Sequence, residues 1–164
     1  MLVNAKFEVQ PFDAAEALLR QPEEEGRPRT LVAFVGRGLA MGERAASILK
    51  DAAAHLARAA AAAKFKGKSG TSLEVLAAPG APASRVILIG LGQGEDAEGD
   101  AAKPFEDFFA LGGQTAAKIG PGGRAIVLFD LPDGLSAAHD AVSQFALGGW
   151  LRSYKFDHYK TKKK

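Results

Sequence analysis

Two glycine-containing stretches have the spacing closest to a ligand-binding motif. Gly67-Lys68-Ser69 has the form of the end of a nucleotide phosphate loop, G-x-x-x-x-G-K-[ST], but the position of its first glycine is taken by Ala62. A phosphate loop also joins a strand to a following helix, whereas this stretch follows a predicted helix and precedes a predicted strand. We therefore favour a glycine turn that ends the helix.

The second stretch, Gly90-Leu91-Gly92-Gln93-Gly94, follows a predicted strand, as a dinucleotide fingerprint does. The pattern G-x-G-x-x-G needs a further glycine where this chain has Glu95, and the acidic residues that follow would repel a pyrophosphate. A flexible loop at the end of the strand is the favoured interpretation. Gly90, Gly92 and Gly94 are still the best candidates for a ligand-binding loop.

Other residues able to do chemistry are dispersed. The histidines His55, His139 and His158 show no metal-binding spacing, and the acidic clusters at 23–25 and 95–100 fall in predicted loops. The clusters can bind a cation, although solvated loop charge is commoner. No G-x-S-x-G sequence is present, and the lack of cysteine excludes disulfides, thiolate metal sites and a cysteine nucleophile. The sequence therefore assembles no catalytic site.

The segment 150–164 is strongly basic, with six basic residues and one acid, whereas the rest has fifteen basic residues and eighteen acids. Four lysines near its end can contact phosphates: Lys160, Lys162, Lys163 and Lys164. Three aromatic side chains are available for stacking: Tyr154, Phe156 and Tyr159. We favour an interdomain linker whose aromatics pack on the body. The net charge of −3 on the body does not imply a nucleic-acid-binding domain.

Apolar patterns predict the elements that position these stretches. Strands are predicted at 6–10, 31–35, 72–76, 85–91 and 125–129, and helices at 42–63, 104–119 and 136–153. The first strand alternates like a half-exposed edge strand, whereas 31–35 is continuously apolar, as in strands buried on both faces. In the helix at 104–119 we expect an apolar stripe that includes Phe108, Phe109 and Gly112. This order of elements predicts one α/β domain, a mixed sheet covered by helices.

Targeting signals are not evident in the sequence. The first ten residues lack the long apolar segment of a signal peptide, and no apolar run approaches the ~20 residues that span a bilayer. Together with the absence of cysteine, this favours a cytoplasmic location without a membrane partner.

Three segments together resemble one known family. Residues 152–160 (RSYKFDHYK) are similar to the segment that closes the N-terminal domain of the leucyl (cytosol) aminopeptidases. Residues 64–68 (KFKGK), after an alanine-rich helix, resemble the F-x-G-K element of that family, and 85–92 (RVILIGLG) its strand ending in G-L-G. The order and spacing of the three segments also agree with the family.

The resemblance implies a three-layer α/β/α, macro-domain-like fold, with residues 1–152 as the N-terminal domain and 153–164 as the start of a basic linker. It implies a parent exopeptidase that releases N-terminal amino acids, leucine favoured, from peptides. In that family a C-terminal catalytic domain holds two divalent metals (zinc, manganese or magnesium). None of its metal-binding or catalytic motifs occurs here, so this chain is expected to be inactive and to hold no cofactor.

The role implied for this domain is in the assembly of a homo-hexamer and in access to its active sites. Two alternatives stay open. Macro-like folds in other families bind ADP-ribose near the ends of strands, which here would be the loop from Gly90 to Gly94. Some bacterial members of the aminopeptidase family bind DNA through this domain, and the basic segment offers such a contact.

Overall fold

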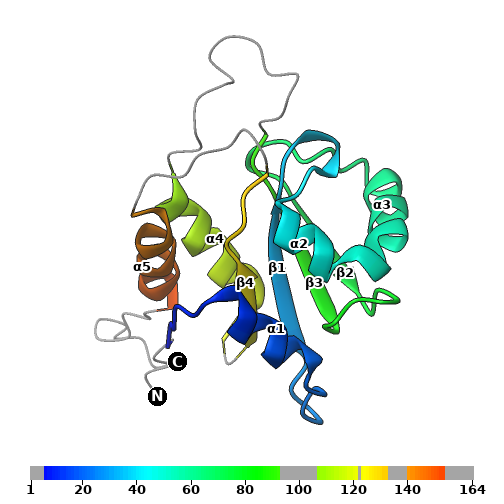
Figure 1. Cartoon of the computed structure of the whole chain (residues 1–164). Helices are drawn as coiled ribbons and strands as arrows, with labels where there is room; N and C mark the ends of the chain where they lie inside the picture. Colours follow the sequence, from blue (N-terminus) through cyan, green and yellow to red (C-terminus); the bar gives the residue numbers. More distant parts are fainter. Residues whose placement is uncertain (1–5, 93–106, 122, 133–139, 154–164) are drawn as a thin grey trace, which may run out of the picture.

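The computed structural model describes residues 6–92, 107–121, 123–132 and 140–153 (Figure 1). Its elements in chain order are α1 (Phe12–Arg20), β1 (Arg29–Val35), the 3₁₀ turn η1 (Arg37–Leu39), α2 (Glu43–Ile48), the 3₁₀ turn η2 (Lys50–Ala52), α3 (Ala53–Ala62), β2 (Ser72–Leu76), β3 (Arg85–Gly90), α4 (Phe108–Ile119), β4 (Arg124–Leu128) and α5 (Ala141–Ser153). No helix within these ranges has the length and apolar character needed to cross a bilayer.

The four strands form one mixed sheet in the order β2-β3-β1-β4. β1 runs parallel to both β3 and β4, while β2 pairs with β3 in the antiparallel direction. Val35 is paired with Gly90, so the carboxyl ends of these parallel strands meet at one edge. The predicted mixed sheet is confirmed.

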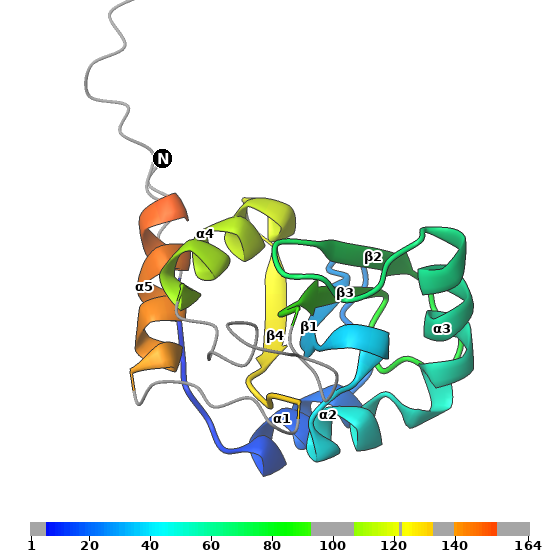
Figure 2. The ribbon, with the colours of Figure 1, turned by 90° about the horizontal axis from the view of Figure 1, so that it is seen from above.

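Helices cover both faces of the sheet, which gives the predicted three layers (Figure 2). Successive side chains of a strand point to opposite faces. Leu31, Ala33 and Val35 of β1 join the core that contains α2 and α3, whereas Val32 and Phe34 join the core that contains α4 and α5. Burial on both faces explains why this strand is continuously apolar.

One continuous helix was predicted at 42–63, and this prediction was wrong, because the helix is broken into two pieces. Leu49 and Ala52 have φ/ψ of −96°/6° and −95°/−6°, and between them the 3₁₀ turn η2 separates α2 from α3. A 3₁₀ turn serves as a connector between α-helices. The turn lets both pieces keep their inner residues, such as Ala45 and Leu56, against the sheet.

The N-terminal segment differs from the predicted edge strand. Residues 6–11 form no strand, and the ring of Phe7 lies against Gly149 of α5 instead. The unpredicted α1 begins after Pro11 and packs Phe12, Ala15 and Leu19 on the sheet. Their spacing is helical, but the segment is short and lies between two proline-containing stretches.

Helix α4 begins at Phe108, and residues 104–106 of the predicted helix lie outside the described part. Phe109, which was predicted on the apolar stripe, is 43% exposed, so this assignment was wrong. The buried residues are Phe108, Leu111, Gly112 and Thr115. Phe109 lies about 100° around the helix from Phe108 and so misses this face.

Candidate functional site

The two glycine-containing stretches lie side by side at the carboxyl edge of the sheet. The amide of Gly90 donates to the carbonyl oxygen of Thr71 at 2.8 Å, and that of Gly92 donates to Gly67 at 2.9 Å. The amide of Leu91 donates to the carbonyl oxygen of Val35, also at 2.9 Å. A glycine loop cradles phosphate with unpaired amide groups, and in this loop three consecutive amides are already paired within the protein.

Close backbone contact explains the glycines in these stretches. A Cβ atom at Gly90 would lie 2.2 Å from the carbonyl oxygen of Lys68, and one at Gly92 would lie 2.5 Å from the amide nitrogen of Ser69. A Cβ at Gly67 would lie 2.1 Å from the carbonyl oxygen of Gly36, and Gly67 has φ +72°. The glycines therefore let three backbone segments contact one another. Gly94 lies outside the described residues.

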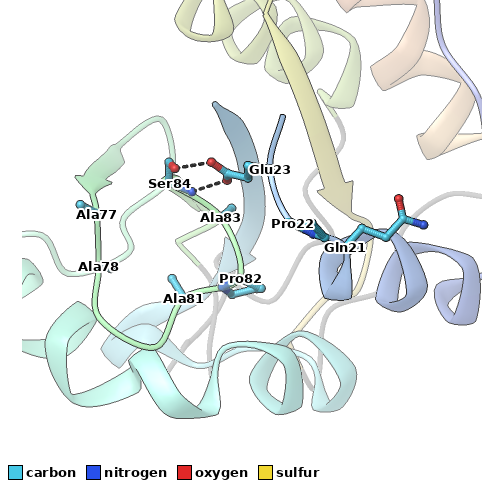
Figure 3. A pocket seen from close by; sticks show the side chains of 9 residues that line it. All are labelled: Gln21, Pro22, Glu23, Ala77, Ala78, Ala81, Pro82, Ala83 and Ser84. Atoms are coloured by element: carbon cyan, nitrogen blue, oxygen red, sulfur yellow. Dashed lines mark hydrogen bonds between the residues drawn. The ribbon is translucent and has the colours of Figure 1, made fainter. Parts of the chain in front are cut away.

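A shallow hollow of about 380 Å³ lies between the end of α1 and the β2–β3 connection (Figure 3). It is lined by Gln21, Pro22, Glu23, Ala77, Ala78, Ala81, Pro82, Ala83 and Ser84. Glu23 is the one charged residue among these, and both of its carboxylate oxygens accept hydrogen bonds from Ser84. The Ser84 amide donates at 2.7 Å, and the Ser84 hydroxyl donates to the other oxygen.

The Glu23–Ser84 contact has a structural role. Burial raises the pKa of Glu23, but the hydrogen bonds from Ser84, with a smaller contribution from Arg29, outweigh it and hold the pKa below its ordinary value. The Ser84 hydroxyl donates a hydrogen bond to the Glu23 carboxylate, whose lowered pKa makes it a weak base, and no histidine is among the residues that line the hollow. The pair fastens the loop before β1 to the connection before β3.

The histidines and acidic residues considered as candidates in the sequence do not come together in the described structure. His55 is half-buried on α3, while His139 and His158 lie outside the described residues. In the described part of the chain no three histidine or acidic side chains gather in a way that could hold a metal ion. Glu24 forms ion pairs with Arg27 at 3.5 Å and Arg124 at 3.3 Å.

The basic segment falls beyond the last described residue. The favoured linker and the alternative of a phosphate contact through Lys160, Lys162, Lys163 and Lys164 both concern residues outside the described ones. Both stay predictions.

One surface was missed by the sequence reasoning. Leu147, Trp150 and Leu151 project from α5 and are 49%, 43% and 46% exposed. We call these three residues the α5 outer stripe. The available signal was that α5 is apolar on more than one side and has a single charged residue, Arg152.

Comparison with known proteins places the chain. Residues 32–163 match the cytosol aminopeptidase family, N-terminal domain. A "Probable cytosol aminopeptidase" of Methylorubrum populi is 47% identical over 85% of this chain and 27% of its own length. Proteins of the same name from Afipia carboxidovorans and Rhodopseudomonas palustris are 42% and 44% identical, each over 82% of this chain and 26% of their own length.

A solved structure shares the fold. A mutant of tomato leucine aminopeptidase superposes with a TM-score of 0.54 at 22% identity, over 85% of this chain and 28% of that one. The chain thus spans about a quarter of the length of the curated relatives it matches. Since the family match covers most of its residues, the chain belongs to the cytosol aminopeptidase family, as an N-terminal domain.

Proposed function

We propose that this chain is the non-catalytic N-terminal domain of a longer leucyl aminopeptidase. The observation that carries the proposal is the coverage: relatives named as aminopeptidases match 82–85% of this chain with only 26–27% of their own length. Residues 1–152 form the domain in this proposal, and 153–164 begin the linker to the part that performs catalysis.

The proposed parent is a cytoplasmic exopeptidase that releases N-terminal amino acids, leucine favoured, from peptides. Two divalent cations, zinc, manganese or magnesium, would activate a water molecule for attack on the peptide bond. The proposal assigns the cation ligands to the remainder of the parent. Among the acids of the described residues, Glu24 pairs with Arg27 and Arg124, and Glu23 accepts hydrogen bonds from Ser84.

The proposed role of the domain is to support assembly of a homo-hexamer and access to its active sites. A buried core lies on each face of the sheet, and such close packing suits a rigid module. An ADP-ribose-binding module is less well supported, because the amides of Gly90 to Gly92 are paired within the protein.

Hydrolysis of a leucine anilide in the presence of manganese tests the proposal. The 164-residue chain is expected to give no turnover above a preparation made identically from host cells without its gene. A longer chain, in which Lys164 is followed by the unmatched remainder of the Methylorubrum populi relative, is expected to be active. Turnover that rises in proportion to the 164-residue chain would contradict the proposal.

A further inference from the structure

One edge of strand β4 has no strand partner in the described part of the chain. β4 is the last strand in the order β2-β3-β1-β4, so its outer edge presents backbone amide and carbonyl groups that no strand binds. Ile126 and Val127 of β4 are half-buried, whereas their β1 partners Leu31 and Val32 are fully buried. Since Ile126 and Val127 point to opposite faces of the sheet, β4 is incompletely covered on both faces.

The two edge strands of the sheet differ in how their edges are protected. Natural proteins discourage pairing at a sheet edge by placing charged side chains there. β2, at the opposite edge, carries Glu74 at its centre, and this carboxylate pairs with Arg85 at 2.8 Å. β4 has the sequence RAIVL, in which the charged residue is Arg124 at the first position. The outer edge of β4 is therefore better suited than β2 to pair with another strand.

Residues 6–10 (KFEVQ) have the properties of a strand without a partner. Polar and apolar side chains alternate along them, and Pro11 favours an extended conformation at the residue before it. All five residues are exposed, and Val9 is 77% exposed. Within the described structure their backbone groups form no hydrogen bond. Five extended residues span about 17 Å, which matches the length of the five-residue β4.

The start of helix α1 is held near the end of β4. Helix α1 begins directly after Pro11, and Asp13 in its first turn pairs with Arg44 at 2.7 Å. The amide of the next residue, Ala45, donates at 2.9 Å to Asp130, which lies two residues after β4. These two contacts hold the end of segment 6–10 close to the carboxyl end of β4.

The other end of the segment contacts the α4–α5 layer. The ring of Phe7 lies against Gly149 of α5, and the segment runs from α5 to α1 on the β4 side of the sheet (Figure 2). In an extended strand Phe7 and Val9 point to one face. Beside β4 this face would be the α4–α5 side, to which Val127 also points, and the polar side chains at 6, 8 and 10 would face away from it.

We propose that the outer edge of β4 binds residues 6–10 of the same chain as a fifth strand. In this structure the segment is undocked and is held beside the edge by Phe7 and α1. Docking supplies hydrogen-bond partners to both backbones and closes the edge to a second copy. A short covalent connection gives a millimolar effective concentration, so at micromolar protein the segment outcompetes a second copy. This inference is independent of the proposed function.

Hydrogen exchange, measured by NMR on the 164-residue chain, tests the proposal. Successive amides of a strand point to opposite edges, so either Glu8→Pro or Val9→Pro removes an amide that faces β4. Glu8→Ala and Val9→Ala are the matched controls, since they shorten the same side chains and keep every amide. Slow exchange of the β1 amides shows that a variant is folded.

In the unsubstituted chain, we expect the amides of 124–128 that do not bond to β1 to exchange at least about tenfold more slowly than in the proline variant that removes the facing amide. The alternate amides of 6–10 that face β4 should be protected as well. Both alanine controls should keep most of this protection, because backbone pairing does not need the original side chains.

Three results would overturn the proposal. The first is exchange of residues 6–10 in the unsubstituted chain at the rate of an unstructured peptide. The second is equal exchange at 124–128 in the unsubstituted chain and in both proline variants, or a loss of protection as large in an alanine control as in its proline variant. The third is protection that decreases on dilution, which would show that a second copy occupies the edge.

Discussion

The two helical layers use different small residues to approach their neighbours. Helices α2 and α3 place alanines such as Ala45 and Ala60 against the sheet, with Leu49 and Leu56 between them. Helices α4 and α5 meet through glycines instead: a Cβ at Gly148 would lie 1.9 Å from the carbonyl oxygen of Phe109.

This difference decides which side chains remain available outside the domain. A helix that packs by alanine methyl groups still presents side chains to the sheet, and its large residues are used there. Two helices whose backbones touch need no side chain between them. Large residues of α5 can therefore point away from the domain, as the α5 outer stripe does.

The largest expected effect is a clash in the glycine contact. Gly148→Ala should lower the free energy of unfolding by about 3 kcal/mol, because the new methyl group meets backbone that cannot move independently. Gly113→Ala is the matched control on α4, where the nearest atom would lie at 3.5 Å. That variant should be neutral or up to about 1 kcal/mol more stable, since alanine favours helix. Urea unfolding measures both, and equal stabilities would contradict a backbone contact between these helices.

A cavity in the alanine layer should have a smaller effect. Leu56→Ala removes a side chain that is 1% exposed and should lower the free energy of unfolding by about 2.5 kcal/mol. This value is near the low end for such changes because the small neighbours can close part of the cavity. Leu18→Ala, on the half-exposed Leu18, should lower it by less than about 1 kcal/mol. A loss at Leu56 as small as that at Leu18 would show that α3 is not tightly packed.

Removing a helix cap should change the free energy of unfolding less, and by slightly different amounts in the two helical layers. The carboxylate of Asp130, after β4, accepts a hydrogen bond from the Ala45 amide of α2 at 2.9 Å, across 85 positions of sequence. Asp107 caps its own helix α4 through the Ala110 amide at 2.9 Å. Asp130→Ala should lower the free energy of unfolding by about 1–2 kcal/mol and Asp107→Ala by about 1 kcal/mol.

The corresponding asparagine variants keep an acceptor oxygen and serve as controls for both caps. Each should change the free energy of unfolding by a few tenths of a kcal/mol, measured in urea. An Asp130→Asn variant as unstable as Asp130→Ala would show that the charge matters more than the hydrogen bond.

The smallest expected effect is a pH dependence of the free energy of unfolding, caused by Glu23. The pKa of Glu23 is lowered on folding, since hydrogen bonds from Ser84 outweigh burial. The resulting stability is present above the unfolded glutamate pKa of about 4.3 and is lost as pH falls through the lower folded value. We expect a loss below about 1 kcal/mol, because the group is partly solvated. Ser84→Ala should flatten this part of the pH profile of urea unfolding, and an unchanged profile would contradict the assignment.

Much of the fold was predictable from local patterns. Strand β2 has the predicted bounds, and β1, β3 and β4 differ from prediction by a residue or two at their ends. A continuous or alternating run of apolar residues indicates a strand whichever strand it pairs with. The sequence alone is therefore enough to predict these strands. The strand predicted at 6–10 failed because Phe7 contacts α5, a residue pair separated by more than a hundred positions.

The candidate site was less predictable than the fold. Gly90 and Gly92 were correctly placed at the end of a strand, but glycine serves equally for a phosphate and for a neighbouring backbone. Only the partners of the amides distinguish these uses, and those partners, such as Thr71 and Gly67, come from another loop.

The sequence by itself determined the α/β class, the buried central strand and the family, because these depend on residue types in local order and on similarity along the chain. The tertiary structure alone decided that Asp130 caps α2, that Ser84 binds Glu23 and that α5 turns an apolar side outward. Each of these depends on the packing of elements distant in sequence, and a local sequence pattern does not specify which distant element will lie beside it.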